Sequence, residues 1–160
     1  MEDERQHALV WDDVPIQEDW IDFNGHLNMA YYLVVFDRAV DRLMRHVGLS
    51  DQADDGDTLF AVEASLRYLA EVKLDDRVAC VTRVLFVDDK RMLTWQELRH
   101  ADGRVAATCE NVHLHVDRKE AEARVWRFSD EVRTALSALV DRDTPPPEHS
   151  RMSGLGWIAP

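Results

Sequence analysis

Residues 22–29 read Asp22-Phe23-Asn24-Gly25-His26-Leu27-Asn28-Met29 and stand directly before the longest periodic apolar run of the chain. Gly25 can adopt backbone angles that other residues avoid, and Asn24 or Asn28 can cap a following helix by accepting a hydrogen bond from a free N–H group. The first turn of such a helix offers unpaired donors and a partial positive charge. The segment therefore combines a carboxylate, an imidazole and a helix start that favours anions, which is typical of a hydrolytic site.

The run that follows has helical periodicity. Between Leu27 and Val47, apolar residues recur every three or four positions with charged residues between them. This spacing predicts an amphipathic helix of about six turns, built to lie under a sheet. Gly48 is a natural stop for it.

Beyond residue 58 the apolar period changes to two, which predicts strands. In the final strand the apolar parity changes near Glu110 and Asn111, and a bulge there would reconcile its two halves. Asp130 to Val140 is a short amphipathic stretch with Ser129 as a candidate cap. The expected strands are 8–16, 59–69, 77–87, 91–100 and 104–117.

Composition limits the function classes. At 160 residues the chain fits one domain, expected over 1–142, with an irregular tail over 143–160. The net charge of −12 argues against nucleic acid and anionic membrane surfaces as partners. Cys80 and Cys109 lie in apolar runs and are expected to be reduced core residues. The acidic start lacks the apolar region of a signal peptide, so a cytoplasmic location is expected.

Several segments resemble the hotdog-fold acyl-CoA thioesterases of the 4-hydroxybenzoyl-CoA thioesterase type. That family carries an Asp-x-x-Gly-His-Val-Asn-Asn-like signature ahead of a long central helix, and this chain departs from it at Leu27 and Met29. Residues 68–72, 88–91 and 107–117 are most similar to the betainyl-CoA thioesterases found beside carnitine-degradation enzymes. The resemblance implies an α+β hotdog fold, an antiparallel sheet wrapped around the long helix. The periodicity alone supports only α+β.

The resemblance also implies that Asp22 is the catalytic carboxylate. Thioester hydrolysis needs either a nucleophile that forms an anhydride or a base that activates water, and the sequence leaves both open. Backbone N–H groups near Asn28 and Met29 would stabilise the negative oxygen that develops on the thioester. His26 could orient the substrate or polarise water, and a structural histidine is the alternative. Asn28 could hold water or the carbonyl, or simply cap the helix.

Trp20, Tyr31 and Glu63 are candidate contacts for the acyl group. Aromatic faces hold quaternary ammonium groups such as the betaine headgroup through cation–π attraction, although Trp20 and Tyr31 could also be ordinary core residues. Glu63 could face the same pocket or be a solvated strand carboxylate.

Three basic residues, Arg67, Lys90 and Arg91, are candidate contacts for the phosphates of coenzyme A, against the alternative of solvated charges. The pair Lys90-Arg91 is preferred because the resembling branch carries it at this turn.

Other chemistries find little support. His113 and His115 share one strand face, but no third ligand is indicated and no metal is expected. The chain has no serine-hydrolase elbow, phosphate-binding glycine loop or dinucleotide fingerprint. No cofactor is expected, because coenzyme A is part of the substrate.

The sequence therefore predicts an enzyme that cleaves a short, polar acyl-CoA, with betainyl-CoA as the candidate, to the free acid and coenzyme A. A homodimer is expected, because a single curved sheet leaves an open edge and a shallow pocket, and a dimer of dimers is left open. The family implies that the site lies at that interface. The alternatives are a non-catalytic acyl-CoA-binding module and a hotdog enoyl-CoA hydratase.

Overall fold

The computed structural model describes residues 7–49, 56–118, 122–140, 142 and 146–152. The expected order of one strand, one long helix and an antiparallel meander is confirmed, and the 3-10 helix and the last short strand are additions that the sequence did not predict. In chain order the elements are β1 (Ala8–Trp11), the 3-10 helix η2 (Glu18–Trp20), α1 (Met29–His46), β2 (Asp57–Tyr68), β3 (Val78–Val87), β4 (Arg91–His100), β5 (Val105–Asp117), β6 (Arg124–Val125) and α2 (Asp130–Ala138).

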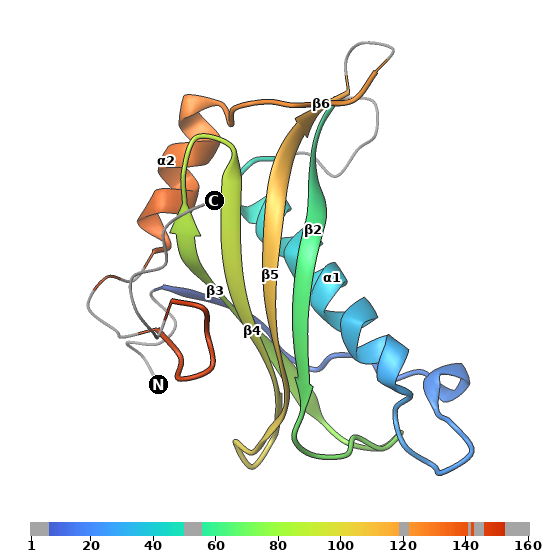
Figure 1. Ribbon diagram of the computed structural model, residues 1–160. Helices are drawn as coiled ribbons and strands as arrows, with labels where there is room; N and C mark the ends of the chain where they lie inside the picture. Colours follow the sequence, from blue (N-terminus) through green and yellow to red (C-terminus); the bar gives the residue numbers. More distant parts are fainter. Residues whose placement is uncertain (1–6, 50–55, 119–121, 141, 143–145, 153–160) are drawn as a thin grey trace.

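The strands form one curved antiparallel sheet in the order β1-β3-β4-β5-β2, and β6 adds to β5. Helix α1 crosses one face of this sheet, which we call the inner face, and α2 lies beside one end of β3 (Figure 1). The expected sheet wrapped around a long helix is therefore confirmed. Strand β2 forms one edge of the sheet, and among the described elements it pairs only with β5.

Helix α1 is held to the sheet by its apolar stripe. Phe36 and Leu43 are at most 1% exposed, and burying each side chain contributes about 2–3 kcal/mol. One core cluster surrounds the N-terminal half of the helix, and a second joins its C-terminal half to α2. Gly48 follows the helix with φ 79°, a backbone conformation that favours glycine.

The bulge expected near Glu110 and Asn111 is wrong, because the irregularity lies in the neighbouring strand. Strand β5 pairs with β2 without a break there, while β2 has one extra residue between Ala61 and Glu63. Residues Asn111 and His113 therefore face α1 from the inner face, and Val112 between them faces outward, packed with Leu93 and Trp95. The apolar parity changes within β5 because its outer face is covered too.

The described part of the C-terminal tail helps to cover that outer face. Met152 packs against the outer cluster, and the Ser150 hydroxyl donates to the carboxylate of Glu110, which is 3% exposed. Arg151 joins Glu110 to Glu63 through two ion pairs. Trp157, which the sequence placed in the tail, lies outside the described residues.

Within the described ranges, neither α1 nor α2 is long and apolar enough to cross a membrane.

Candidate active site

The signature segment forms a tight loop that fixes the Asp22 carboxylate. Its Oδ1 accepts hydrogen bonds from the backbone N–H groups of Asn24 at 2.8 Å and His26 at 3.4 Å. The Asp22 N–H donates to the His26 carbonyl oxygen at 2.9 Å, and the Gly25 N–H donates to the Asp22 carbonyl oxygen at 2.9 Å. Gly25 has φ 79°, so the turn uses the conformation that glycine provides.

Two backbone hydrogen bonds attach this loop to the rest of the fold. The Leu27 N–H donates to the Val72 carbonyl oxygen at 2.7 Å, and the Asn28 N–H donates to the Trp20 carbonyl oxygen at 2.9 Å. The Asn28 side chain then caps α1 by accepting from the Ala30 N–H at 3.0 Å. The predicted cap is confirmed, and it starts the helix directly beside Asp22.

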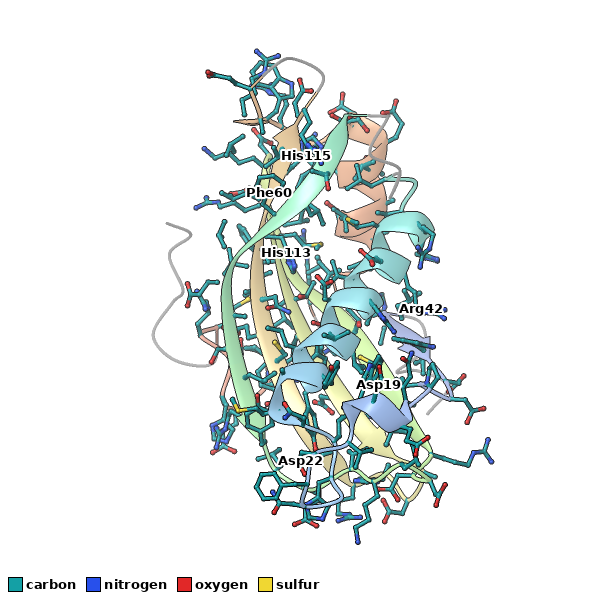
Figure 2. All side chains as sticks on the ribbon, turned by 90° about the vertical axis from the view of Figure 1, so that its right-hand side faces the viewer. Asp19, Asp22, Arg42, Phe60, His113 and His115 are labelled. Atoms are coloured by element: carbon teal, nitrogen blue, oxygen red, sulfur yellow. The ribbon has the colours of Figure 1, made fainter. Side chains whose placement is uncertain are left out.

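Asp22 and the first turn of α1 line one cleft of about 400 Å³, which we call the Asp22 cleft. His26, Met29, Tyr32 and Tyr68 also line it. Asp22 lies at the lower end of the sheet, next to the start of α1 (Figure 2). Three of the four residues that the sequence proposed for catalysis, Asp22, His26 and Met29, therefore line this cleft. The fourth, Asn28, lies next to it as the cap of the helix that begins with Met29.

Two tyrosines form a wall of the Asp22 cleft, and the sequence did not predict a role there for Tyr68. The Tyr68 hydroxyl donates to the Met29 carbonyl oxygen at 3.0 Å, and the Tyr32 hydroxyl donates to the Ala70 carbonyl oxygen at 3.4 Å. Burial raises the pKa of both phenols, so they stay protonated at neutral pH. Tyr68 belongs to residues 68–72, one of the segments that carry the family resemblance, and this is the sequence feature that could have pointed to it.

Glu71 is the other residue that sequence reasoning missed. Its Oε2 lies 3.0 Å from Nε2 of His26, and both residues line the Asp22 cleft. Glu71 follows β2 by three positions, in the same resembling segment as Tyr68. The imidazole therefore has a carboxylate partner, which orients its ring.

Trp20 and Tyr31 do not form an open aromatic cage. Their rings stack with centroids 5.1 Å apart, and the guanidinium of Arg38 lies 5.0 Å from the Trp20 ring centroid. Trp20 is 4% exposed. A ligand cation would have to displace one of these contacts to reach the indole face.

Glu63 does not face the Asp22 cleft, contrary to the sequence expectation. The bulge after Ala61 turns it to the outer face, where Arg151 binds it with Nη2–Oε1 and Nη1–Oε2 distances of 2.5 and 3.0 Å. The hydrogen bonds from Arg151 lower the pKa of the Glu63 carboxyl. Arg67 is exposed and pairs with Thr108, two residues before the outward-facing Glu110, so it also belongs to the outer face.

Lys90 and Arg91 lie at the opposite end of the sheet from Asp22. They sit in and after the turn between β3 and β4, and β4 spans about 30 Å. Arg91 is bound by Asp88, with an Nε–Oδ2 distance of 2.7 Å. Burial alone would raise the pKa of Asp88, but hydrogen bonds from Arg91 and from two backbone N–H groups bring it below its usual value. Within one chain, this pair is not brought to the Asp22 cleft.

His113 and His115 both face the helix side of the sheet (Figure 2). One ring nitrogen of His115, Nδ1, lies 3.1 Å from the Trp126 carbonyl oxygen, and Nε2 lies 3.9 Å from Asp57. No group of three or more metal-ligating side chains occurs in the part of the chain that the structure describes.

The chain was compared with known families, proteins and structures. A family model described as the thioesterase-like superfamily matches residues 16–138. The betainyl-CoA thioesterase of Pseudomonas aeruginosa is 37% identical over 158 residues, which cover 92% of this chain and 96% of that protein.

Two solved structures extend the comparison. A Pseudomonas putida KT2440 protein proposed to be a thioesterase is 35% identical, covers 93% of this chain and 97% of its own, and superposes with a TM-score of 0.75. A mutant 4-hydroxybenzoyl CoA thioesterase complexed with 4-hydroxybenzoyl CoA is 11% identical over 81% of this chain and 99% of its own. Its TM-score of 0.73 establishes a common fold.

Proposed function

The chain belongs to the thioesterase-like superfamily, and on that premise we propose that it hydrolyses a short, polar acyl-CoA, with betainyl-CoA as the substrate. The similarity to the Pseudomonas aeruginosa betainyl-CoA thioesterase supports this substrate, because it extends over nearly the whole of both chains. The products are the free carboxylic acid and coenzyme A.

The observation that carries the proposal is the position of Asp22 beside the start of α1, with both lining one cleft. Oδ1 of Asp22 is engaged by the loop N–H groups, which leaves Oδ2 as the oxygen that faces a substrate. The Asn28 N–H donates to the Trp20 carbonyl oxygen, and the Ala30 N–H donates to the Asn28 side chain. Between them lies Met29, the first residue of α1, and its N–H has no acceptor among the described residues. We assign this N–H as the oxyanion donor, where the helix dipole adds to its effect.

The reaction follows from these two groups. In one form, Oδ2 of Asp22 bonds to the thioester carbon, the C–S bond breaks, the sulfur leaves as the coenzyme A thiolate and takes up a proton, and water hydrolyses the resulting anhydride. In the other form, Asp22 removes a proton from water as the water attacks the same carbon. Both forms place negative charge on the carbonyl oxygen, where the Met29 N–H stabilises it. In this proposal His26, whose Nε2 lies 3.0 Å from Oε2 of Glu71, orients the attacking water.

We also propose that the protein acts as a homodimer, joined through the free edge of β2. This edge strand is twelve residues long and exposes Phe60 and Val62, each about half accessible. A long exposed edge is a template for pairing with another strand. Antiparallel pairing of two such edges would bring Lys90 and Arg91 of one copy towards the Asp22 cleft of the other, where they could meet the phosphates of coenzyme A. Sedimentation at the mass of one 18.5-kDa chain would contradict this.

The test of the enzymatic proposal is the variant Asp22→Asn. The amide oxygen of Asn can still accept the two loop hydrogen bonds, so the fold should be retained while the nucleophile or base is lost. Thiol release from betainyl-CoA should fall roughly 10²- to 10⁴-fold, while the Kd for a non-hydrolysable thioether analogue stays within a few-fold.

The matched control is Asp19→Asn, an equal charge change at an exposed position of the 3-10 helix η2, three residues earlier. It should keep the wild-type rate. A native protein that binds the analogue but releases no thiol from betainyl-CoA or from medium-chain acyl-CoAs would be a binding module, and the proposal would be wrong.

A further inference from the structure

The Tyr68 side chain reaches from the sheet to the first turn of α1. Tyr68 is the last residue of β2, and its hydroxyl donates to the Met29 carbonyl oxygen at 3.0 Å. The end of β2 and the start of α1 both lie near the lower end of the molecule (Figure 1). The residue that accepts this hydrogen bond is also the one whose N–H is assigned as the oxyanion donor. One side chain of the sheet therefore contacts the residue that would stabilise the oxyanion.

Packing does little to hold Met29, because its side chain is 66% exposed. The Asn28 cap lies within the first turn, so it does not fix that turn relative to the sheet. Two hydrogen bonds to other elements do so. The Asn28 N–H donates to the Trp20 carbonyl oxygen at 2.9 Å, and the Met29 carbonyl oxygen accepts from Tyr68. The first bond fixes the chain just before the Met29 N–H, and the second fixes it just after.

Tyr68 is itself held by its neighbours. Its ring packs edge-on against Tyr32, with centroids 5.2 Å apart and an interplanar angle of 81°, and Tyr32 is 4% exposed. Directly after Tyr68, the N–H groups of Leu69 and Ala70 both donate to the Ala106 carbonyl oxygen, at 2.8 and 3.0 Å. These contacts join Tyr68 to the core and to β5, so its hydroxyl gives the helix start a fixed point of attachment.

We propose that Tyr68 is a positioning residue, whose hydroxyl holds the Met29 N–H where the oxyanion of the thioester develops. This assignment rests on the proposed function and adds a residue to its site. An oxyanion donor must lie about 2.7–3.1 Å from the developing charge, so a small displacement of the first turn lowers the rate. Helix ends fray, and without the hydroxyl the first turn would lose its bond to the sheet. Tyr68 acts only through Met29 in this role.

The test is Tyr68→Phe, which keeps the ring and its contact with Tyr32 and removes only the hydroxyl. An oxyanion donor acts on charge that develops in the transition state, so kcat for betainyl-CoA should fall while KM stays within twofold. Loss of a whole oxyanion donor costs about 10²–10³ in kcat, and a displaced donor keeps part of its effect, so we expect a fall of roughly tenfold. A hydroxyl that only stabilises the fold would instead lower the melting temperature and leave kcat unchanged.

Infrared spectroscopy gives a second readout, at the carbonyl group itself. In a ketone analogue of betainyl-CoA a methylene replaces the thioester sulfur, so the ligand binds without being cleaved. In the wild-type complex the Met29 N–H should move the stretching frequency of the isotope-labelled carbonyl to a lower value, because a hydrogen bond weakens the C=O bond. Tyr68→Phe should lose at least half of this shift. The Kd for the thioether analogue, which lacks the carbonyl, should stay within twofold.

Ser137→Ala is the matched control. It also removes an exposed hydroxyl that donates to a helix carbonyl oxygen, that of Arg133 at 2.7 Å, but it does so on α2, away from the Asp22 cleft. It should keep the wild-type kcat and the wild-type infrared shift. A Tyr68→Phe variant with kcat within twofold of wild type, with its loss in KM, or with an unchanged carbonyl frequency overturns the positioning role and leaves the thioesterase proposal intact. If the wild type releases no thiol, both proposals fail.

Discussion

A buried chain of hydrogen bonds joins Phe36, Gln96 and Asn111, and it gives a prediction whose size follows from its contacts. Gln96→Met replaces the amide with an apolar side chain of similar length. The variant removes the hydrogen bond to the Phe36 carbonyl and leaves Nδ2 of Asn111 without its acceptor in a site that is 4% exposed. A lost hydrogen bond costs about 0.5–1.5 kcal/mol and a stranded buried donor about 1–3 kcal/mol. We expect the free energy of unfolding to fall by about 2–4 kcal/mol.

Urea denaturation and calorimetry measure this effect, and the melting temperature should fall by roughly 4–16 °C, at about 2–4 °C per kcal/mol for a domain of this size. The double variant Gln96→Met/Asn111→Leu removes both stranded groups, so its cost should be at least about 1 kcal/mol below the sum of the single variants. Gln17→Met is the control, because Gln17 is exposed and its side chain makes no capping bond. Additive costs, or a Gln96→Met variant as stable as the control, would refute the hydrogen-bond chain.

Three further predictions concern titration, reactivity and the Asp22 cleft. The folded protein resists protonation of His113, whose pKa burial lowers to about 4, against 6.5 for a free imidazole. The free energy of unfolding should therefore fall by up to about 3 kcal/mol as the pH drops from 6.5 to 4. In urea denaturation, the stability of His113→Leu should depend less on pH than that of the wild type, and an equal dependence would contradict this. Burial raises the thiol pKa of Cys80 and Cys109 to about 12. Iodoacetamide at pH 8 should therefore leave both cysteines unmodified in the native protein and label both in urea, as measured by mass spectrometry. Rapid labelling of the native protein would disprove their burial. Glu71→Gln should lower kcat/KM less than about fivefold, because the contact between Glu71 and His26 is largely exposed to solvent. A loss as large as that of Asp22→Asn would mean that Glu71 takes part in the chemistry.

The elements of the fold could be read from local patterns. The helical spacing after Leu27 and the alternation beyond residue 58 gave α1 and four strands with ends within two residues of the observed ones. The cap at Asn28 and the cap at Ser129, which accepts from the Val132 N–H at 3.2 Å, were equally accessible. The family resemblance supplied the hotdog arrangement, and the match to residues 16–138 confirms it. The helix, the strands and the two caps were predictable because each depends on neighbours in the sequence.

The site was predictable only where the chain is local. Asp22, His26, Asn28 and Met29 lie within eight residues, so one loop brings them together. Tyr68 and Glu71 reach the same cleft from the far end of β2, and no local pattern marks them as its partners. The substrate role of Lys90-Arg91 stays a prediction that needs a second copy of the chain, because the pair lies at the other end of the sheet.

Strand β5 shows why the remaining signal was misread. An apolar parity that changes within a strand has two physical explanations, an inserted residue or a strand whose two faces are both covered, and the sequence alone does not distinguish them. With the inserted residue placed in β2 instead, Glu63 turns outward and Ala61 and Ala64 both stay on the inner face. Asn111 and His113 then face α1 from a wall where apolar residues would pack more stably. Polar side chains kept at such positions have a cost in stability, which the hydrogen bond from Nδ2 of Asn111 to Oε1 of Gln96 offsets in part.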